Sequence, residues 1–125
     1  MKILNFEDNV FKYHDICKVL KDELSVTVDQ ASNLEKGVEM LQKAYDEGRS
    51  YDLIITDMWF PVRFGEKPEQ SGELLIKTLE KRQLNIPVIM CSSINYQIPG
   101  ILGSVHYSEN ENWEIQLIQM VKKLK

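Results

Sequence analysis

The stretch Asp52–Pro61, with the sequence DLIITDMWFP, is the most informative part of this 125-residue chain. It contains an apolar run, Leu53–Thr56, in which two isoleucines stand side by side and apolar and polar residues do not alternate. Such a run is typical of a strand that is buried on both faces of a sheet. Asp57 follows the run directly, so we expect its carboxylate at the carboxyl end of this strand.

Segments of two periods alternate on both sides of this stretch. Short apolar runs predict strands, and apolar residues at helical spacing predict amphipathic helices between them. This alternation predicts an α/β fold with a doubly wound, five-stranded parallel sheet in the flavodoxin-like order 2-1-3-4-5, formed by residues 1–125 as a single domain. The predicted strands are Ile3–Phe6, Ser25–Val28, Leu53–Thr56, Val88–Cys91 and Val105–Tyr107, and the predicted helices are Val10–Leu24, a helix between the cap Asn33 and the stop Gly48, Gly72–Gln83, and Trp113–Leu124.

Two segments break the regular pattern. The polar segment Val62–Ser71 contains Gly65 and Pro68, and it is predicted to be a loop. The segment between the last two predicted strands contains Pro99 and Gly100, which predict that the fourth helix of the fold is shortened or broken.

Composition limits the classes of function. The net charge of −4 gives no indication of a nucleic-acid-binding surface, and the 43% hydrophobic content is ordinary for a globular protein. The N-terminal residues resemble neither a signal peptide nor a membrane span. The two cysteines, Cys17 and Cys91, have no metal-binding or redox spacing and are interpreted as buried free thiols. We therefore expect a cytoplasmic protein that binds neither nucleic acid nor membrane.

Acidic and hydroxyl residues follow three strands that are neighbours in the predicted sheet. Glu7 and Asp8 follow the first strand, Asp57 the third, and Ser92 the fourth. Because ligands bind at the carboxyl ends of such strands, these side chains are expected to converge. Clustered carboxylates repel one another unless a proton or a cation intervenes, and oxygen ligands without His or Cys favour Mg²⁺. The alternative is that these acids merely end strands at the surface.

These residues carry a resemblance to the receiver domain of bacterial response regulators, the chemotaxis-regulator-like modules of two-component signalling. The resemblance covers nearly the whole chain, and its motifs occur in the family's order. The motifs are Ile3–Asn9 for the first strand and its acidic pair, Asp52–Pro61 for the acceptor strand and the following proline, Gly72–Leu75 for the next helix, and Pro87–Ser93 for the fourth strand with its switch hydroxyl.

The resemblance implies a Mg²⁺-dependent phosphoacceptor and not an enzyme in the usual sense, with at most its own phosphorylation and dephosphorylation. The phosphoryl group would come from a histidine kinase or a phosphotransfer protein, and the signal would pass to an unknown output protein by contact. By this resemblance, Asp57 would be the phosphoacceptor, Ser92 the switch hydroxyl and Tyr107 the possible switch aromatic. Asp8, Asp57 and the backbone carbonyl of Trp59 would be metal ligands, and Glu7 would bind the metal directly or through water.

One family feature is missing. Receivers carry a lysine at the end of the fifth strand, but this chain has no Lys or Arg between Arg82 and Lys122, and the position falls within Tyr107–Asn110. The long segment after Pro61 contains Arg63 and Lys67. One hypothesis is that one of these two cations replaces the missing charge. The alternative is a solvated loop with scattered charges.

Two other functional classes are open. A degenerate receiver that binds a partner without phosphorylation is favoured by the missing lysine and the altered fourth helix. A small enzyme of flavodoxin-like fold is disfavoured, because the chain has no glycine-rich phosphate loop and does not carry Ser, His and Asp in the order of a catalytic triad.

Overall fold

The computed structural model describes residues 1–124, and its central feature is a five-stranded parallel sheet in the order β2-β1-β3-β6-β7. This is the predicted flavodoxin-like order, because β6 and β7 are the fourth and fifth strands of the sheet. The bounds are Lys2–Phe6 for β1, Thr27–Ala31 for β2, Leu53–Thr56 for β3, Val88–Ser92 for β6 and Gly103–His106 for β7.

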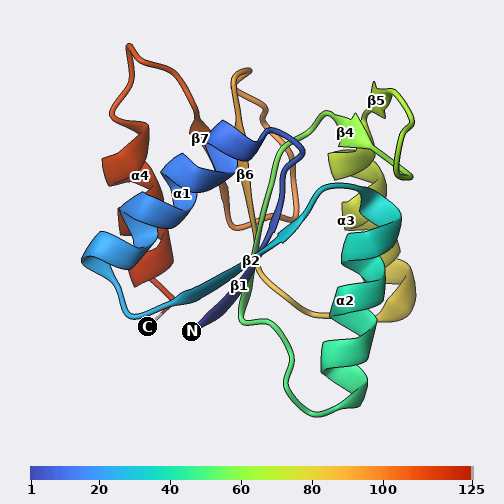
Figure 1. Cartoon of the computed structure of the whole chain (residues 1–125). Helices are drawn as coiled ribbons and strands as arrows, with labels where there is room; N and C mark the ends of the chain where they lie inside the picture. Colours follow the sequence, from blue (N-terminus) through green and yellow to red (C-terminus); the bar gives the residue numbers. More distant parts are fainter. Residues whose placement is uncertain (125) are drawn as a thin grey trace.

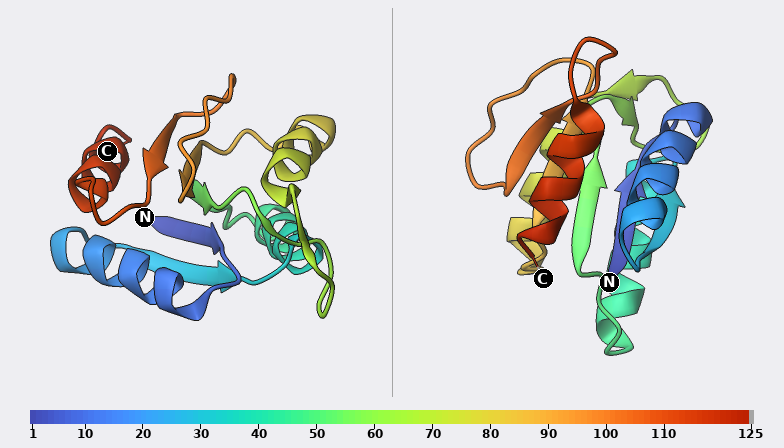
Figure 2. Two further views of the ribbon diagram at one scale, coloured as in Figure 1. Left: turned by 90° about the horizontal axis from the view of Figure 1, so that it is seen from above. Right: turned by 90° about the vertical axis from the view of Figure 1, so that its left-hand side faces the viewer.

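Helices cover both faces of the sheet, as Figures 1 and 2 show. One face is covered by α1 (Val10–Glu23) and α4 (Trp113–Lys122), and the other by α2 (Leu34–Asp46) and α3 (Ser71–Arg82). Neighbouring residues of a strand point to opposite faces, so Leu53 and Ile55 pack under the first pair of helices while Ile54 packs under the second. Burial on both sides explains why this strand is a continuous apolar run.

The second strand is displaced from its predicted position. It was predicted at Ser25–Val28, but the structure has Thr27–Ala31, where each residue pairs with one of β1. Asp29 and Gln30 lie in this edge strand because their polar groups find partners. Tyr51 Oη donates to Asp29 Oδ2 at 2.7 Å, and Gln30 Nε2 donates to the backbone oxygen of Glu7 at 2.8 Å.

The predicted loop after β3 contains a small hairpin. Strands β4 (Phe60–Pro61) and β5 (Pro68–Glu69) pair antiparallel, and Gly65 lies between them with a φ of 81°. The hairpin is anchored by the fully buried Phe60 side chain, and Ser71 Oγ donates to the Phe60 backbone oxygen. The prediction of a loop was therefore incomplete, because two buried contacts at the base of the segment outweigh its polar composition.

No helix forms between β6 and β7 within residues 93–102. Pro99 has no backbone N–H, and Gly100 adopts a φ of 84°, so the helical hydrogen-bond pattern cannot continue across them. The expected change in the fourth helix is confirmed in its strongest form. Within the described residues 1–124, four helices flank the sheet instead of the five that the strand count would allow.

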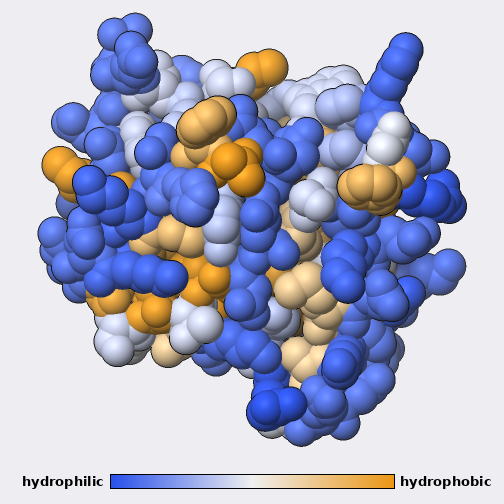
Figure 3. All heavy atoms as spheres, in the orientation of Figure 1, coloured by the Kyte–Doolittle hydropathy of each residue, from blue (hydrophilic) through white to orange (hydrophobic). Residues whose placement is uncertain are grey.

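Hydrophilic residues dominate the surface seen in Figure 3, and hydrophobic residues form small groups among them. Within residues 1–124, no helix combines the length and the apolar character that crossing a bilayer requires.

Candidate functional site

The loops that follow β1, β3, β6 and β7 enclose one cavity of about 360 Å³ at the carboxyl edge of the sheet. This edge is where ligands bind in folds of this type. The structure thus brings Glu7, Asp8 and Asp57 to a single cavity. The lining residues are Glu7, Asp8, Asn9, Phe11, Lys12, Asp57, Ser93 and Tyr107.

Asp57 is held firmly at the end of β3. Its backbone N–H donates to the Phe6 oxygen at 3.1 Å, and its Oδ1 accepts from the Met58 N–H at 2.7 Å. Gly72 packs so closely against this segment that a Cβ at its position would stand only 2.6 Å from the Asp57 backbone oxygen. The Asp57 side chain keeps 17% of its surface exposed, so the carboxylate is fixed in direction yet accessible.

Glu7 is more deeply placed than its neighbour Asp8. Its residue is 1% exposed, its N–H donates to the Ala31 oxygen at 2.9 Å, and its Oε2 accepts from the Asn9 N–H at 3.1 Å. Burial raises the pKa of the Glu7 carboxyl, and the nearby Lys12 opposes that rise. Asp8 is exposed and faces the same cavity.

Lys12 lies between the two strand-end carboxylates. It stands in the first turn of α1 and is 8% exposed. Its Nζ lies 2.9 Å from Glu7 Oε1, 3.4 Å from Asp57 Oδ2 and 2.7 Å from the Cys91 backbone oxygen. Burial lowers the pKa of Lys12, but Glu7 and Asp57 outweigh that effect, so its pKa is raised and the ammonium stays charged at neutral pH.

Lys12 was not among the predicted site residues, because it lies inside a predicted amphipathic helix, where a single polar residue is ordinary. A signal was available: the first turn of a helix carries partial positive charge and disfavours lysine. A lysine three residues after the cap Asn9, and five after Glu7, is therefore out of place unless carboxylates surround it.

The structure does not bring Arg63 or Lys67, the two cations of the segment after Pro61, to the cavity at Asp57. Arg63 Nε lies 3.2 Å from Glu35 Oε2, and its Nη1 lies 3.8 Å from Glu66 Oε2. Arg63 and Lys67 are both exposed, and neither lines the cavity. The structure gives no support to the hypothesis that one of them supplies the missing charge, because the segment folds as a hairpin whose arginine pairs with acids of α2 and of its own turn.

Of the hydroxyl and aromatic residues predicted for the site, Tyr107 lines the cavity and Ser92 does not. Ser92 is buried at the end of β6, where its Oγ accepts from the Ile94 N–H at 3.4 Å, and it is Ser93 that lines the cavity. Tyr107 lines the cavity with its ring centroid 5.2 Å from Lys12 Nζ, and its Oη donates to Asp15 Oδ2 at 2.7 Å.

Trp59 links two of the loops at this edge. Its indole Nε1 donates to Tyr96 Oη at 2.7 Å, which joins the segment after β3 to the segment after β6. Trp59 is 44% exposed, and it is not among the residues that line the cavity.

The donor atoms of the cavity suit a hard divalent cation, because they are carboxylate oxygens with no imidazole or thiolate among the lining residues. Within residues 1–124, however, no three His, Cys, Asp or Glu side chains are gathered closely enough to form a ready metal cluster. Lys12 accounts for this, because its ammonium holds Glu7 and faces Asp57. Asp8 and Asp57 are the carboxylates of this cavity that lie open to solvent.

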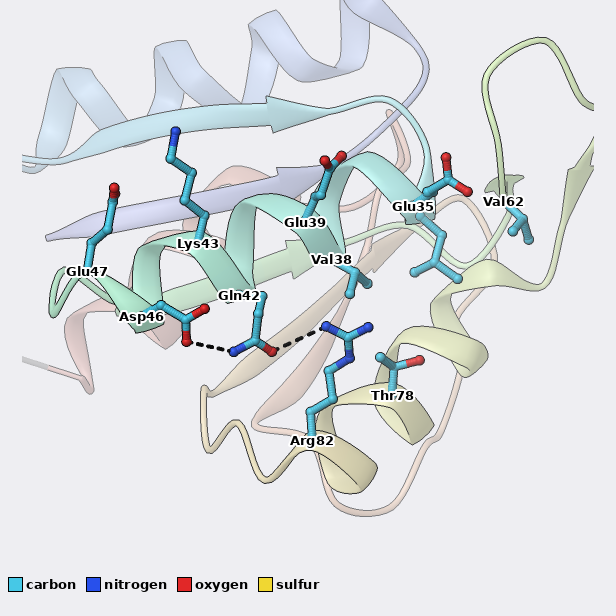
Figure 4. Close-up of a pocket in the computed structure, with 11 residues that line it drawn as sticks. Glu35, Val38, Glu39, Gln42, Lys43, Asp46, Glu47, Val62, Thr78 and Arg82 are labelled. Carbon is cyan, nitrogen blue, oxygen red and sulfur yellow. Dashed lines mark hydrogen bonds between the residues drawn. The ribbon is translucent and has the colours of Figure 1, made fainter.

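A larger cavity of about 610 Å³ lies between α2 and α3 (Figure 4). Gln42 bridges its two walls, because its Nε2 donates to Asp46 Oδ1 at 3.0 Å and its Oε1 accepts from Arg82 Nη1 at 3.2 Å. Volume alone favours this cavity. The smaller one is the better functional candidate, because it stands at the carboxyl ends of the strands and gathers buried charges around an accessible carboxylate.

Solved structures of receiver domains are similar to this chain over nearly its whole length. The chemotaxis response regulator CheY4 of Vibrio cholerae is 18% identical with a TM-score of 0.70, and the match covers 99% of this chain and 98% of that chain. The response regulator TrrA from Thermotoga maritima, in complex with Mg²⁺-BeF, is 22% identical with a TM-score of 0.71 and the same coverage. A chain of the CheX-CheY-BeF3-Mg²⁺ complex from Borrelia burgdorferi is 16% identical with a TM-score of 0.74, covering 99% of this chain and 88% of that one.

Among curated proteins, the uncharacterized protein y4jS of Sinorhizobium fredii is 36% identical over 86 residues, which cover 65% of this chain. The match spans 19% of that protein, so this chain corresponds to about a fifth of its relative. No family model matches the chain.

The chain therefore has the fold of response regulator receiver domains, a flavodoxin-like parallel sheet with helices on both faces. At these identities the likeness to solved structures defines the fold, and the chemistry must be argued from the residues of this chain.

Proposed function

We propose that this protein is a signalling receiver in which Asp57 accepts a phosphoryl group from a histidine kinase or a phosphotransfer protein. The observation that carries this proposal is the Asp57 carboxylate itself. It stands partly exposed at the carboxyl end of β3, with its Oδ1 held by the Met58 N–H and its Oδ2 facing an ammonium group. A carboxylate in that setting is oriented for attack on phosphorus.

The transfer would require little more than positioning and charge neutralisation. An Asp57 carboxylate oxygen forms a bond to phosphorus while the P–N bond of the donor phosphohistidine breaks. The imidazole leaves with the electron pair of that bond and a proton from solvent. The product is an acyl phosphate on Asp57, and the added dianion lies in the cavity lined by Asp8, Lys12 and Ser93.

Mg²⁺ is the proposed cofactor. Asp8, Asp57 and the backbone carbonyl of Trp59 would hold it, with Glu7 as a further ligand directly or through water. Bound there, Mg²⁺ would neutralise charge that builds up on the phosphoryl oxygens. The presence of Mg²⁺ in the TrrA and CheX-CheY structures supports this choice.

Signalling would occur by protein contact in the cytoplasm. Phe11 is 79% exposed and lines the cavity, so a donor or output protein that approaches Asp57 meets an apolar side chain at the rim. Exposed aromatic side chains are common anchors in protein interfaces. Ser92, and Tyr107 as the possible switch aromatic, are the proposed groups that would report the phosphoryl group to such a partner.

A second candidate is a receiver that binds its partner without being phosphorylated. The pairing of Lys12 with Glu7, which neutralises that buried carboxylate without any added cation, favours this candidate.

Mass measurement after incubation with a small-molecule phosphodonor separates the two. The first candidate predicts that the protein gains one phosphoryl group in the presence of Mg²⁺, that chelation of Mg²⁺ abolishes the gain, and that Asp57→Asn does not gain it. A natural protein that stays unmodified while folded would contradict the first candidate and support the second.

A further inference from the structure

Lys12 is the one charged group of the cavity for which the resemblance to receivers gives no role. We propose that Lys12, from the first turn of α1, supplies the ammonium group that contacts the phosphoryl oxygens on Asp57, in place of a lysine at the end of the last strand. This inference rests on the proposed function and names the residue that would complete its charge balance.

The hydrogen-bonding capacity of the ammonium fits this role. It has three N–H donors. One of them is donated to the Cys91 backbone oxygen at 2.7 Å, and the ammonium forms ion pairs with Glu7 Oε1 at 2.9 Å and Asp57 Oδ2 at 3.4 Å. The distance to Asp57 Oδ2 lies beyond the normal range for a hydrogen bond, so a gap remains between the two groups. A phosphoryl oxygen added to Asp57 would enter this gap and could accept from an N–H of the ammonium.

The position of Lys12 would cost free energy if no carboxylates lay near its ammonium group. A cation in the first turn of a helix opposes the helix dipole, and burying an ammonium removes its hydration. The structure nevertheless buries this lysine to 8% exposure and orders the turn around it, because the Asn9 side chain accepts from the backbone N–H groups of Phe11 and Lys12. Glu7 and Asp57 are the groups that offset both costs.

The end of the last strand explains why the charge comes from elsewhere. Of the segment Tyr107–Asn110, only Tyr107 lines the cavity, and it brings an aromatic ring and not a charge. Its Oη is bonded to Asp15 of α1, and its ring packs on Trp113 with centroids 4.8 Å apart. With Lys12 Nζ 5.2 Å from its ring centroid, Tyr107 covers the lysine that replaces the missing one.

The test compares Lys12→Met with Lys18→Met, an exposed lysine of the same helix that does not line the cavity. Labelling of Asp57 by a phosphodonor at saturating Mg²⁺ is expected to fall roughly tenfold to a hundredfold in Lys12→Met, because a charge-assisted hydrogen bond is lost, and to stay unchanged in Lys18→Met. If Lys12→Met is labelled at the natural rate, the inference is overturned while the proposed function stands. If the natural protein is not labelled, the proposed function fails first.

Two further measurements exclude a merely structural role. Calorimetric titration with beryllofluoride and Mg²⁺ should show weaker beryllofluoride binding by Lys12→Met, whereas binding of Mg²⁺ alone should be tighter because a cation has left the cavity. Equal affinities in the two proteins would contradict the inference.

The double variant Lys12→Met/Tyr107→Lys returns an ammonium from the end of β7, and it decides the question if Lys12→Met does not fold. A folded double variant that is labelled within about tenfold of the natural rate supports the inference. A folded double variant that is not labelled overturns it.

Discussion

Gly72 lies at the start of α3 with its backbone pressed against Asp57 and Met58. Its N–H donates to the Met58 oxygen at 3.0 Å, and a Cβ would come within 2.9 Å of the Met58 Cα. Both contacts are to backbone atoms, which cannot move aside as the end of a flexible side chain can. Gly72 therefore sets the distance between the helix and the segment that carries Asp57.

Gly72→Ala is expected to lower the free energy of unfolding by about 1–3 kcal/mol, because the methyl group forces the helix away from the end of β3. Denaturant unfolding measures the loss. Gly48→Ala is the contrasting variant, since no atom lies within 4 Å of a Cβ there, although its positive φ of 72° adds a cost of its own. The explanation fails if Gly72→Ala is as stable as the natural protein.

At the scale of the element, the cap of α1 orders the turn that carries Lys12 into the cavity. Asn9 Oδ1 accepts from Phe11 N–H at 2.9 Å and from Lys12 N–H at 3.1 Å, while Asn33 Oδ1 caps α2 by accepting from Lys36 N–H at 2.8 Å. The two asparagines each cap the N-terminus of a helix, but only Asn9 orients a residue that lines the cavity.

Asn9→Ala and Asn33→Ala are each expected to cost about 1 kcal/mol of stability. Only Asn9→Ala is expected to slow phosphodonor labelling of Asp57 as well, because it loosens the turn that holds Lys12. Thermal unfolding and labelling rates, measured on both variants, check this pair of expectations. Equal labelling rates in the two would show that the cap contributes stability alone.

The hairpin β4–β5 carries two exposed cations, Arg63 and Lys67, neither of which lines the cavity. The double variant Arg63→Ala/Lys67→Ala is expected to leave the labelling rate unchanged and to lower stability by less than about 1 kcal/mol, since exposed ion pairs such as Arg63–Glu35 contribute little. Labelling rates and denaturant unfolding measure both quantities. A strong loss of labelling would show that a cation of the hairpin contributes to phosphorylation of Asp57 after all.

The elements that the sequence predicted well are those whose pattern follows from burial. Leu53–Thr56 is a continuous apolar run because both faces of β3 are covered, and its predicted bounds match the structure. The edge strand β2 was misplaced because hydrogen bonds to its side chains, and not apolar alternation, hold Asp29 and Gln30 in place. The hairpin was missed because its base is fixed by tertiary contacts of Phe60.

The candidate site was predictable to the extent that strand ends determine it. Topology alone places Glu7, Asp8 and Asp57 at one edge of the sheet. The position of Lys12 was not predictable from periodicity, because it depends on how far its side chain reaches across the ends of three strands to the Cys91 carbonyl. Contacts of that kind arise only when the whole sheet is assembled.

On the scale of the whole molecule, two helix-covered faces form the scaffold and one edge gathers the charged groups. The two hydrophobic clusters on opposite faces hold the strands in register, and the register in turn places the strand ends around one cavity. The segment 93–102 and the β4–β5 hairpin both lie outside the five-stranded sheet. Their conformations can therefore vary without disturbing this scaffold. The surface of these two segments can vary as well, while Asp57 keeps its position at the end of β3.

The proposed function requires Asp57 to become an acyl phosphate. The most direct measurement treats the protein with a phosphodonor and Mg²⁺, reduces the product with borohydride, and maps the chain by mass spectrometry. If Asp57 is the phosphoacceptor, reduction converts position 57 to homoserine, no other carboxylate is converted, and omission of the phosphodonor abolishes the conversion. An intact aspartate at position 57, or conversion at Glu7 or Asp8 instead, would contradict it.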